Sequence, residues 1–292
     1  MTVAEHPSVV RLLSVASNRG YPTGHADRGS EVLRPLVAAW LHQCGVVVDG
    51  DLPVPVEADE GMAAMLSSLS ATVAEAITRG RQAWVVGGDH VIAAGTWRGV
   101  SRALATRVGL LWIDAHLDAH TPWTSPSGNA HGMPLAALLG RGDPAWSGPC
   151  LDPTRVVVFG ARSHEPAEQA LLRDQGVRVI EMSEIRRRGL STCWREAVAI
   201  VADDSLAFGL TIDLDAFDPD EIPGVATPVP GGLAVGELAP LLFDLVRSSH
   251  CVAVEITEFD PELDASGRSI DAVRRLVLAM ASPTPHSIRS DI

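Results

Sequence analysis

Four side chains that can bind a metal ion alternate along one short run of the sequence. Asp114, His116, Asp118 and His120 occur at every second position, directly after the apolar segment Val108–Ile113. In an extended chain alternate residues project to the same side, so these carboxylates and imidazoles are expected to converge. Burying several ionisable groups together is unfavourable unless a cation balances them. The run therefore predicts a metal site whose other ligands come from elsewhere in the chain.

Polar clusters also follow four other apolar segments that are expected to be strands. These clusters are Gly87–His90, Gly160–Glu165, Asp213–Pro219 and Glu255–Asp260. In an open α/β sheet, function collects at the carboxyl ends of the strands, so the five clusters are expected to meet. Each cluster alone has a plainer explanation, such as a turn capped by Asp89 or one rich in Asx hydrogen bonds. A calcium loop of the EF-hand type is disfavoured, because its ligand spacing and final glutamate are missing.

Six side chains in these clusters can bind metal ions. Two imidazoles and four carboxylates are too many for one ion, and they suit two divalent ions that share bridging carboxylates. An oxygen-rich set without sulfur favours Mn²⁺ over a structural Zn²⁺. Two close ions lower the pKa of a bridging water, so that hydrolysis needs no serine or cysteine nucleophile. The six residues are His90, Asp114, His116, Asp118, Asp213 and Asp215.

The composition excludes several other classes of protein. The net charge of −13 argues against a general nucleic-acid role and is attractive to cationic small molecules. The chain has no lysine and its 23 basic residues are all arginine, which removes Schiff-base, Walker-lysine and Ser–Lys chemistry. The four cysteines show no CxxC spacing and are expected to be buried free thiols. No apolar run of about 18 residues occurs and Met1–Arg11 lacks signal-peptide features, so we expect a cytoplasmic protein without a membrane span.

Short apolar runs alternate with segments of helical periodicity along the chain. This pattern predicts an α/β fold with a doubly wound, mainly parallel sheet, in one domain that spans residues 1–292. The predicted strands are Val9–Val15, Gly45–Val48, Ala83–Val86, Val108–Ile113, Arg155–Phe159, Val177–Ile180, Ala207–Ile212 and Val252–Ile256. The predicted helices are Met62–Ile77, Ile92–Ala105, Met133–Leu139, Pro166–Gln175, Thr192–Asp203, Val235–Val246 and Ser269–Met280.

The motifs, taken together, resemble those of the ureohydrolase family. GGDH, DAHLDAH, GNAHGMP, TIDLDAFDP, ATPVPGGL and EFDP occur in this order between Gly87 and Asp264. The family includes arginase, agmatinase, guanidinobutyrase, proclavaminate amidinohydrolase and formimidoylglutamase. The resemblance implies a three-layer α/β/α fold with a sheet of about eight strands, two Mn²⁺ ions per chain, and a homotrimer or homohexamer.

The resemblance also implies how the ions are held. One ion takes His90, Asp114, Asp118 and Asp213, and the other takes His116, Asp114, Asp213 and Asp215. Asp114 and Asp213 are then the bridging ligands.

Three further roles follow from the same match. Asp118 is expected to orient the attacking hydroxide, and His131 to pass a proton to the leaving amine. Glu258 is expected to bind the planar guanidinium, which pairs well with a carboxylate. Thr227 is expected to line the guanidinium pocket. Outside these motifs, His131 reads as an ordinary loop histidine and Glu258 as a solvated residue at a strand end.

Two loops resemble those of arginases in particular. In the loop Thr121–His131, Ser127 and Asn129 stand where arginases contact the α-carboxylate of the substrate. Glu165 stands where an acidic residue reads the α-amino group, and Glu168 matches a second acidic position. The alternative is that both glutamates stabilise the N-terminus of the helix that starts near Pro166.

Three departures from the arginase pattern concern the pocket. His120 stands where arginases usually carry asparagine, within the set that recognises the amino acid. Glu165 is one methylene longer than the aspartate of arginases, and Val91 replaces the serine that usually follows GGDH. A shorter or modified guanidino acid is therefore also compatible with the sequence.

The leading hypothesis is an arginase-like manganese amidinohydrolase. Its expected partner is a cationic guanidino compound, which a hydroxide bridging the ions hydrolyses to urea and an amine. Agmatinase or guanidinobutyrase activity is the first alternative, and the arginase-like loop makes formimidoylglutamase less favoured. A non-catalytic paralogue would be expected to lose metal ligands, and all six are present. A different binuclear hydrolase that shares the broad fold, such as a deacetylase, is the remaining alternative.

Overall fold

The computed structural model describes residues 9–54, 61–202 and 207–283. In these residues eight strands form one sheet in the order β2-β1-β3-β8-β7-β4-β5-β6, and all neighbouring strands pair in parallel. The strands are β1 (Val9–Ser14), β2 (Val47–Pro53), β3 (Gln82–Val86), β4 (Val108–Ile113), β5 (Leu151–Ala161), β6 (Arg178–Glu181), β7 (Phe208–Asp213) and β8 (Cys251–Thr257).

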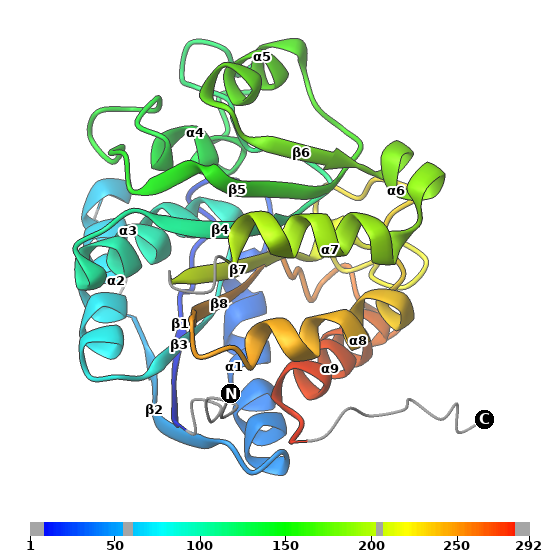
Figure 1. The fold of residues 1–292 in the computed structure, drawn as a ribbon. Coiled ribbons are helices and arrows are strands. Elements are labelled where there is room, and N and C mark those ends of the chain that lie inside the picture. The colour runs from blue at the N-terminus through cyan, green and yellow to red at the C-terminus, as the bar shows by residue number, and fades with distance from the viewer. Residues whose placement is uncertain (1–8, 55–60, 203–206, 284–292) are drawn as a thin grey trace.

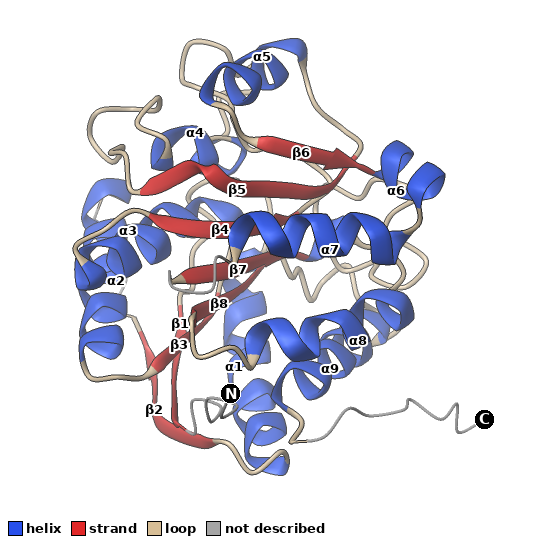
Figure 2. Ribbon diagram, viewed as in Figure 1, coloured by secondary structure: helices blue, strands red, loops and turns tan. Residues whose placement is uncertain are grey.

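Helices cover both faces of this sheet (Figures 1 and 2). They are α1 (Ala26–Gln43), α2 (Met62–Thr78), α3 (Ala93–Leu104), α4 (Pro134–Leu138), α5 (Pro166–Gln175), α6 (Met182–Arg188), α7 (Leu190–Val201), α8 (Val235–Val246) and α9 (Arg268–Ala281). Three short 3₁₀ turns lie in the loops: η1 (His90–Ile92), η2 (Ala130–Gly132) and η3 (Leu214–Ala216).

Alternate residues of the central strands enter two separate cores. In β4, Leu111 and Ile113 pack in the core formed with α1, α6, α7, α8 and α9. Leu110 and Trp112 pack in the other core, with α2, α3, α4 and Leu172 of α5. Successive strand residues project to opposite faces, so a strand with both faces covered is apolar throughout. The predicted three-layer α/β/α architecture is confirmed.

All eight predicted strands are present, with some boundaries changed. β4 matches its prediction residue for residue, whereas β5 begins at Leu151 and not at Arg155. β2 begins at Val47 and continues to Pro53, beyond its predicted end at Val48. The helix predicted at Thr192–Asp203 begins at Leu190 and ends at Val201, and Asp203 lies outside the described residues.

Two helices, α1 and α6, were not predicted. α1 has Gly29 and Pro35 in its interior, and both residues disfavour helix on propensity. Its position depends on tertiary contact, because a Cβ on Gly29 would stand 1.9 Å from the carbonyl oxygen of Phe259. The backbone of α1 therefore lies directly against the loop that follows β8.

The sequence also predicts buried free cysteines and no membrane-spanning helix. The four cysteines are free: Cys150, Cys193 and Cys251 are buried, but Cys44 is only partly buried. Among the described residues, no helix has the length and apolarity needed to cross a bilayer. Residues 1–8, on which much of the signal-peptide argument depends, lie outside the described part of the chain.

Candidate metal centre and its pocket

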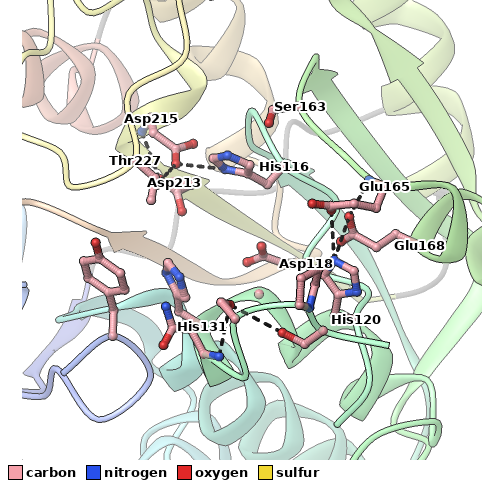
Figure 3. Close-up of a pocket in the computed structure, with 16 residues that line it drawn as sticks. His116, Asp118, His120, His131, Ser163, Glu165, Glu168, Asp213, Asp215 and Thr227 are labelled. Atoms are coloured by element: carbon pink, nitrogen blue, oxygen red, sulfur yellow. Dashed lines mark hydrogen bonds and ion pairs between the residues drawn. The ribbon is translucent and has the colours of Figure 1, made fainter. Parts of the chain in front are cut away.

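Five consecutive strands of the sheet bring the polar clusters together. The clusters follow β3, β8, β7, β4 and β5, which are neighbours in that order. Their side chains line a pocket of about 330 Å³ or lie buried close to it (Figure 3). The clusters thus meet at the carboxyl edge of the sheet, as the strand pattern indicated.

His90 lies in a buried group with three aspartates. Its Nδ1 is 2.9 Å from an oxygen of Asp213, 3.1 Å from one of Asp118 and 3.2 Å from one of Asp114. All four side chains are buried, and within the described residues this Nδ1 has no hydrogen-bond partner. Burial, followed by the charges of Asp215 and Asp114, raises the pKa of Asp213 well above its usual value. Carboxylates gathered around an unpaired ring nitrogen need a cation, and a divalent metal ion fits this donor set.

Asp114 joins this group to a second one, formed with His116 and Asp215. His116 Nδ1 is 3.0 Å from Asp215 Oδ2 and 3.6 Å from Asp114 Oδ1, while Asp114 Oδ2 faces His90. This position suits the bridging role expected of Asp114. Asp213, the other expected bridge, lies only in the first group, and its Oδ1 accepts the N–H of Asp215 at 2.9 Å.

Side chains of the neighbouring strands fix the orientation of the His90 ring. His90 Nε2 lies 3.0 Å from Thr211 Oγ1, whose hydroxyl donates to Glu255 Oε1 at 2.9 Å. On β4, the Trp112 ring stacks on the His90 ring with centroids 4.4 Å apart, and the Trp112 Nε1–H donates to Asp114 at 2.8 Å. Glu255 belongs to the predicted polar cluster Glu255–Asp260, but its contact with Thr211 was not predicted; an ionisable residue within a strand that is otherwise apolar is the signal for such a role.

Glu258 and His131 form a pair beside the metal groups. Glu258 Oε1 accepts the backbone N–H of His90 at 2.7 Å and lies 3.2 Å from His131 Nδ1. Burial alone would lower the pKa of His131, but the hydrogen bond and charge of Glu258 raise it to about 9. Glu258 is buried, and among the described residues its Oε2 has no hydrogen-bond partner. Asp118 and Glu258 both have a positive φ, of 49° and 67°.

All six residues predicted to bind substrate line the same pocket. They are His120, Ser127, Asn129, Glu165, Glu168 and Thr227. The Thr227 hydroxyl donates to Asp215 Oδ2 at 2.9 Å, so it lies at the metal end of the pocket. Figure 3 shows His120, Glu165 and Glu168 on the opposite side from Asp215 and Thr227. We call this opposite side the distal end.

The distal end carries two glutamates with different environments. Glu165 and Glu168 form a reciprocal capping box at the start of α5, so the helix-terminus explanation of these residues is confirmed. Burial and the hydrogen bond that the protonated Glu168 carboxyl donates to Glu165 raise the pKa of Glu168 to about 8. The Glu165 side chain is 53% exposed and faces the pocket. The capping box therefore holds a carboxylate in place at the pocket wall.

The pocket also contains residues that the sequence analysis did not single out. Tyr21 lines it and stacks on His131 with ring centroids 4.8 Å apart, and Ser125 and Ser163 line it as well. Asp89 holds the Tyr21 loop in place by accepting the N–H of Gly20 at 2.9 Å. Asp89 also caps η1, as the turn explanation predicted. The loop contact joins residues 69 positions apart, so no local pattern indicates it.

Arg162 joins the segment Asp215–Phe217 to the loop that contains Val229. Its Nη2 donates to the carbonyl oxygens of Asp215 at 2.8 Å, Val229 at 2.6 Å and Phe217 at 3.2 Å. Nη1 adds a bond to the carbonyl of Ala216 at 3.1 Å. A planar guanidinium with five donors suits such a set of carbonyls. Arg162 thus positions the segment that carries Asp215 relative to the loop after Thr227.

Comparisons with known proteins show which proteins this chain is similar to. A family model described as the arginase family matches residues 26–282. The arginase of Bacillus caldovelox is 38% identical over 234 residues, which cover 78% of this chain and 76% of that protein. The crystal structure of arginase from Bacillus subtilis is similar with a TM-score of 0.88 at 30% identity, covering 94% of this chain and 99% of that one. Formimidoylglutamase from Bacillus subtilis reaches a TM-score of 0.78 at 20% identity, covering 94% and 88%, a likeness of fold alone.

Proposed function

The chain belongs to the arginase family, and from this we propose that it hydrolyses the guanidinium group of L-arginine, or of a related guanidino amino acid, to urea and an amine. Family membership makes it a hydrolase of C–N bonds in linear amidines, of the binuclear metal type. The substrate, the metal and the role of each residue are parts of the proposal.

One pocket joins the two kinds of group that this reaction requires, and this observation supports the proposal most. At one end, His116, Asp213 and Asp215 belong to the candidate metal centre. At the distal end Glu165 offers a carboxylate for an ammonium group, and Ser127, which lines the same pocket, offers a hydroxyl for a carboxylate. An amino acid with a terminal guanidinium presents matching groups at its two ends.

We assign the two metal groups to a pair of Mn²⁺ ions. One would take His90, Asp114, Asp118 and Asp213, and the other His116, Asp114, Asp213 and Asp215. When bound, such ions supply positive charge and lower the pKa of water toward neutrality.

The remaining steps belong to the chain's own side chains. Asp118 accepts a hydrogen bond from the attacking water and orients it. Glu258 has a free, buried Oε2 with which to bind the guanidinium. His131 lies on the pocket wall with its pKa raised to about 9, so it is protonated at neutral pH and can donate a proton to the leaving amine.

Two experiments test this proposal. Turnover of L-arginine, agmatine and 4-guanidinobutyrate by Mn²⁺-loaded protein is compared first, and dominant turnover of agmatine would contradict the arginine assignment.

The second experiment is the substitution E258Q. We expect it to reduce guanidine hydrolysis by about 100-fold, because the carboxylate positioned to pair with the guanidinium is lost. E262Q, on the exposed part of the same loop, is the matched control. Undiminished turnover in E258Q would refute the assigned role.

The location, domain organisation and oligomeric state of the enzyme are also part of the proposal. We propose a cytoplasmic protein in which residues 1–292 form one arginase-like domain and associate as a homotrimer or homohexamer. Light scattering coupled to size-exclusion chromatography measures the assembly directly, and a monomer would contradict it.

A further inference from the structure

Both ring nitrogens of His120 are engaged by the protein itself. Nδ1 lies 3.2 Å from Thr124 Oγ1, and Nε2 lies 2.9 Å from Glu165 Oε2 and 3.4 Å from Glu168 Oε2. The Thr124 oxygen also accepts the N–H of Thr121 at 2.8 Å, which fixes it in the loop. A histidine side chain has no polar atoms besides these two nitrogens. His120 lines the pocket, but it has no hydrogen-bonding atom left to offer a ligand.

The charge available to a ligand at the distal end is therefore negative. Glu165 is half exposed there, and His120 and the capping box hold it in place. Among the described residues that line the pocket none is an arginine, and the chain has no lysine. Away from His116 and His131, which lie beside the metal groups, the pocket lining offers a ligand carboxylate neutral donors such as the Ser127 hydroxyl and the Asn129 amide. A ligand ammonium meets a positioned carboxylate, which forms the stronger, charge-assisted hydrogen bond.

We propose that His120 is a specificity-determining residue that makes the distal end recognise a cationic group and contribute little to recognition of a carboxylate. The substrate class is then wider than amino acids: an alkylamine that carries a terminal guanidinium is accepted beside its α-carboxylated counterpart. This inference rests on the proposed function and adds to it the chemistry of the distal end.

The test compares ligands that differ only in the carboxylate. We measure kcat and KM for L-arginine and agmatine with the Mn²⁺-loaded wild type, H120N and H120A. An asparagine at this position has a free amide donor, so H120N should raise the arginine-to-agmatine ratio of kcat/KM about tenfold, mainly through the KM for arginine. H120A makes room without adding a donor and should leave the ratio near that of the wild type. W123A, an exposed residue of the same loop, is the control for folding and activity.

A binding measurement gives a second readout that does not depend on turnover. Calorimetry with the holoenzyme compares L-ornithine with 1,4-diaminobutane, which differ by the same carboxylate. In the wild type we expect the two dissociation constants to agree within about tenfold. In H120N the dissociation constant of L-ornithine should become clearly lower than that of 1,4-diaminobutane. E165Q, which leaves His120 in place, should weaken both ligands alike.

The outcomes separate this inference from the proposed function. An unchanged ratio in H120N, or an equal rise in H120A, would overturn the role of His120 while hydrolysis of guanidino compounds remained. If the wild type hydrolysed neither compound, the proposed function would fail, and the two amines would still test the distal end. A wild type that bound L-ornithine more than about 100-fold tighter than 1,4-diaminobutane would refute the inference outright.

Discussion

At the scale of single residues, the Glu258–His131 pair sets the charge of an imidazole on the pocket wall. The carboxylate raises the pKa of His131 to about 9 against the opposing effect of burial. Without that carboxylate, burial, which favours the neutral ring, is opposed only by the charges of Asp118 and Asp89. The charge of His131 at neutral pH thus depends mainly on Glu258.

We predict that E258Q lowers the pKa of His131 from about 9 toward its ordinary value of 6.5, because only the charges of Asp118 and Asp89 then oppose burial. Because the folded pKa is raised in the wild type, the pair stabilises the fold fully below about pH 6.5, and this contribution is lost as the pH rises through about 9. NMR titration of the histidines in metal-free protein measures the pKa, and E262Q is the control. A His131 pKa that remained near 9 in E258Q would rule out this origin of the shift.

The chain of contacts from Glu255 through Thr211 to His90 acts on a metal ligand. The Thr211 hydroxyl donates to Glu255, so its oxygen accepts from His90 Nε2–H. In the neutral ring that bond places the proton on Nε2 and leaves Nδ1, which points at the aspartates, as the nitrogen that can bind a metal ion.

We predict that T211V weakens Mn²⁺ binding about 10- to 100-fold, because valine keeps the shape of threonine and removes the hydroxyl. T211S keeps the hydroxyl and should bind Mn²⁺ as the wild type does. Electron paramagnetic resonance of free Mn²⁺ during a titration measures the affinity without reference to turnover. Equal affinity in T211V and T211S would show that the hydroxyl has no such role.

At the scale of elements, most of the sheet could be predicted from the sequence. The elements that are held in place by contacts between distant residues could not. β4, β7 and β8 are recognisable because strands covered on both faces are predominantly apolar. α1 was missed, since its interior Gly29 and Pro35 disfavour helix locally and packing against the sheet overrides them. The loop that carries Tyr21 depends on contacts with distant residues, and nothing in the local pattern specifies such contacts.

We predict that G29A destabilises the protein by about 1–3 kcal/mol through overpacking, because the added methyl meets the carbonyl of Phe259. The displaced loop follows Glu258 directly, so turnover should fall as well. G148A adds a methyl where no atom lies within 4 Å and serves as the control. Denaturant unfolding of both variants measures the difference, and equal stabilities would contradict the close packing of α1.

At the scale of the whole molecule, six candidate ligands could be predicted from the sequence, because residue types that bind metals follow consecutive strands. The position of Asp213 in one group only could not be predicted, since it depends on a hydrogen bond to the backbone of Asp215. The buried carboxylates make the folded chain a far better ligand for divalent cations than the unfolded chain. Binding to the folded state alone stabilises it by mass action.

We predict that Mn²⁺ raises the temperature of thermal unfolding and that a chelator reverses this effect. At a free metal concentration of about 100 times the dissociation constant, the stabilisation is about 2.7 kcal/mol for one site. H164A, which alters a histidine outside both metal groups, should respond as the wild type does, whereas D118A should respond less. Scanning calorimetry makes the comparison, and a wild type insensitive to both additives would count against the metal centre.

The positive φ angles of Asp118 and Glu258 limit how this protein can be made more stable. Among the described residues, the only other non-glycine residue with a positive φ is Ala105, at the end of α3. We expect A105G to relieve its strain at no cost in turnover, since the position carries no chemistry. D118G and E258G would relieve the same strain but remove a carboxylate to which we assign a role in the proposed reaction. Parallel measurements of unfolding free energy and turnover should therefore show a trade-off at two of these positions and none at the third. If the protein were selected for heat resistance alone, substitutions that reduce activity would be expected first at Asp118 and Glu258, where the backbone is left-handed.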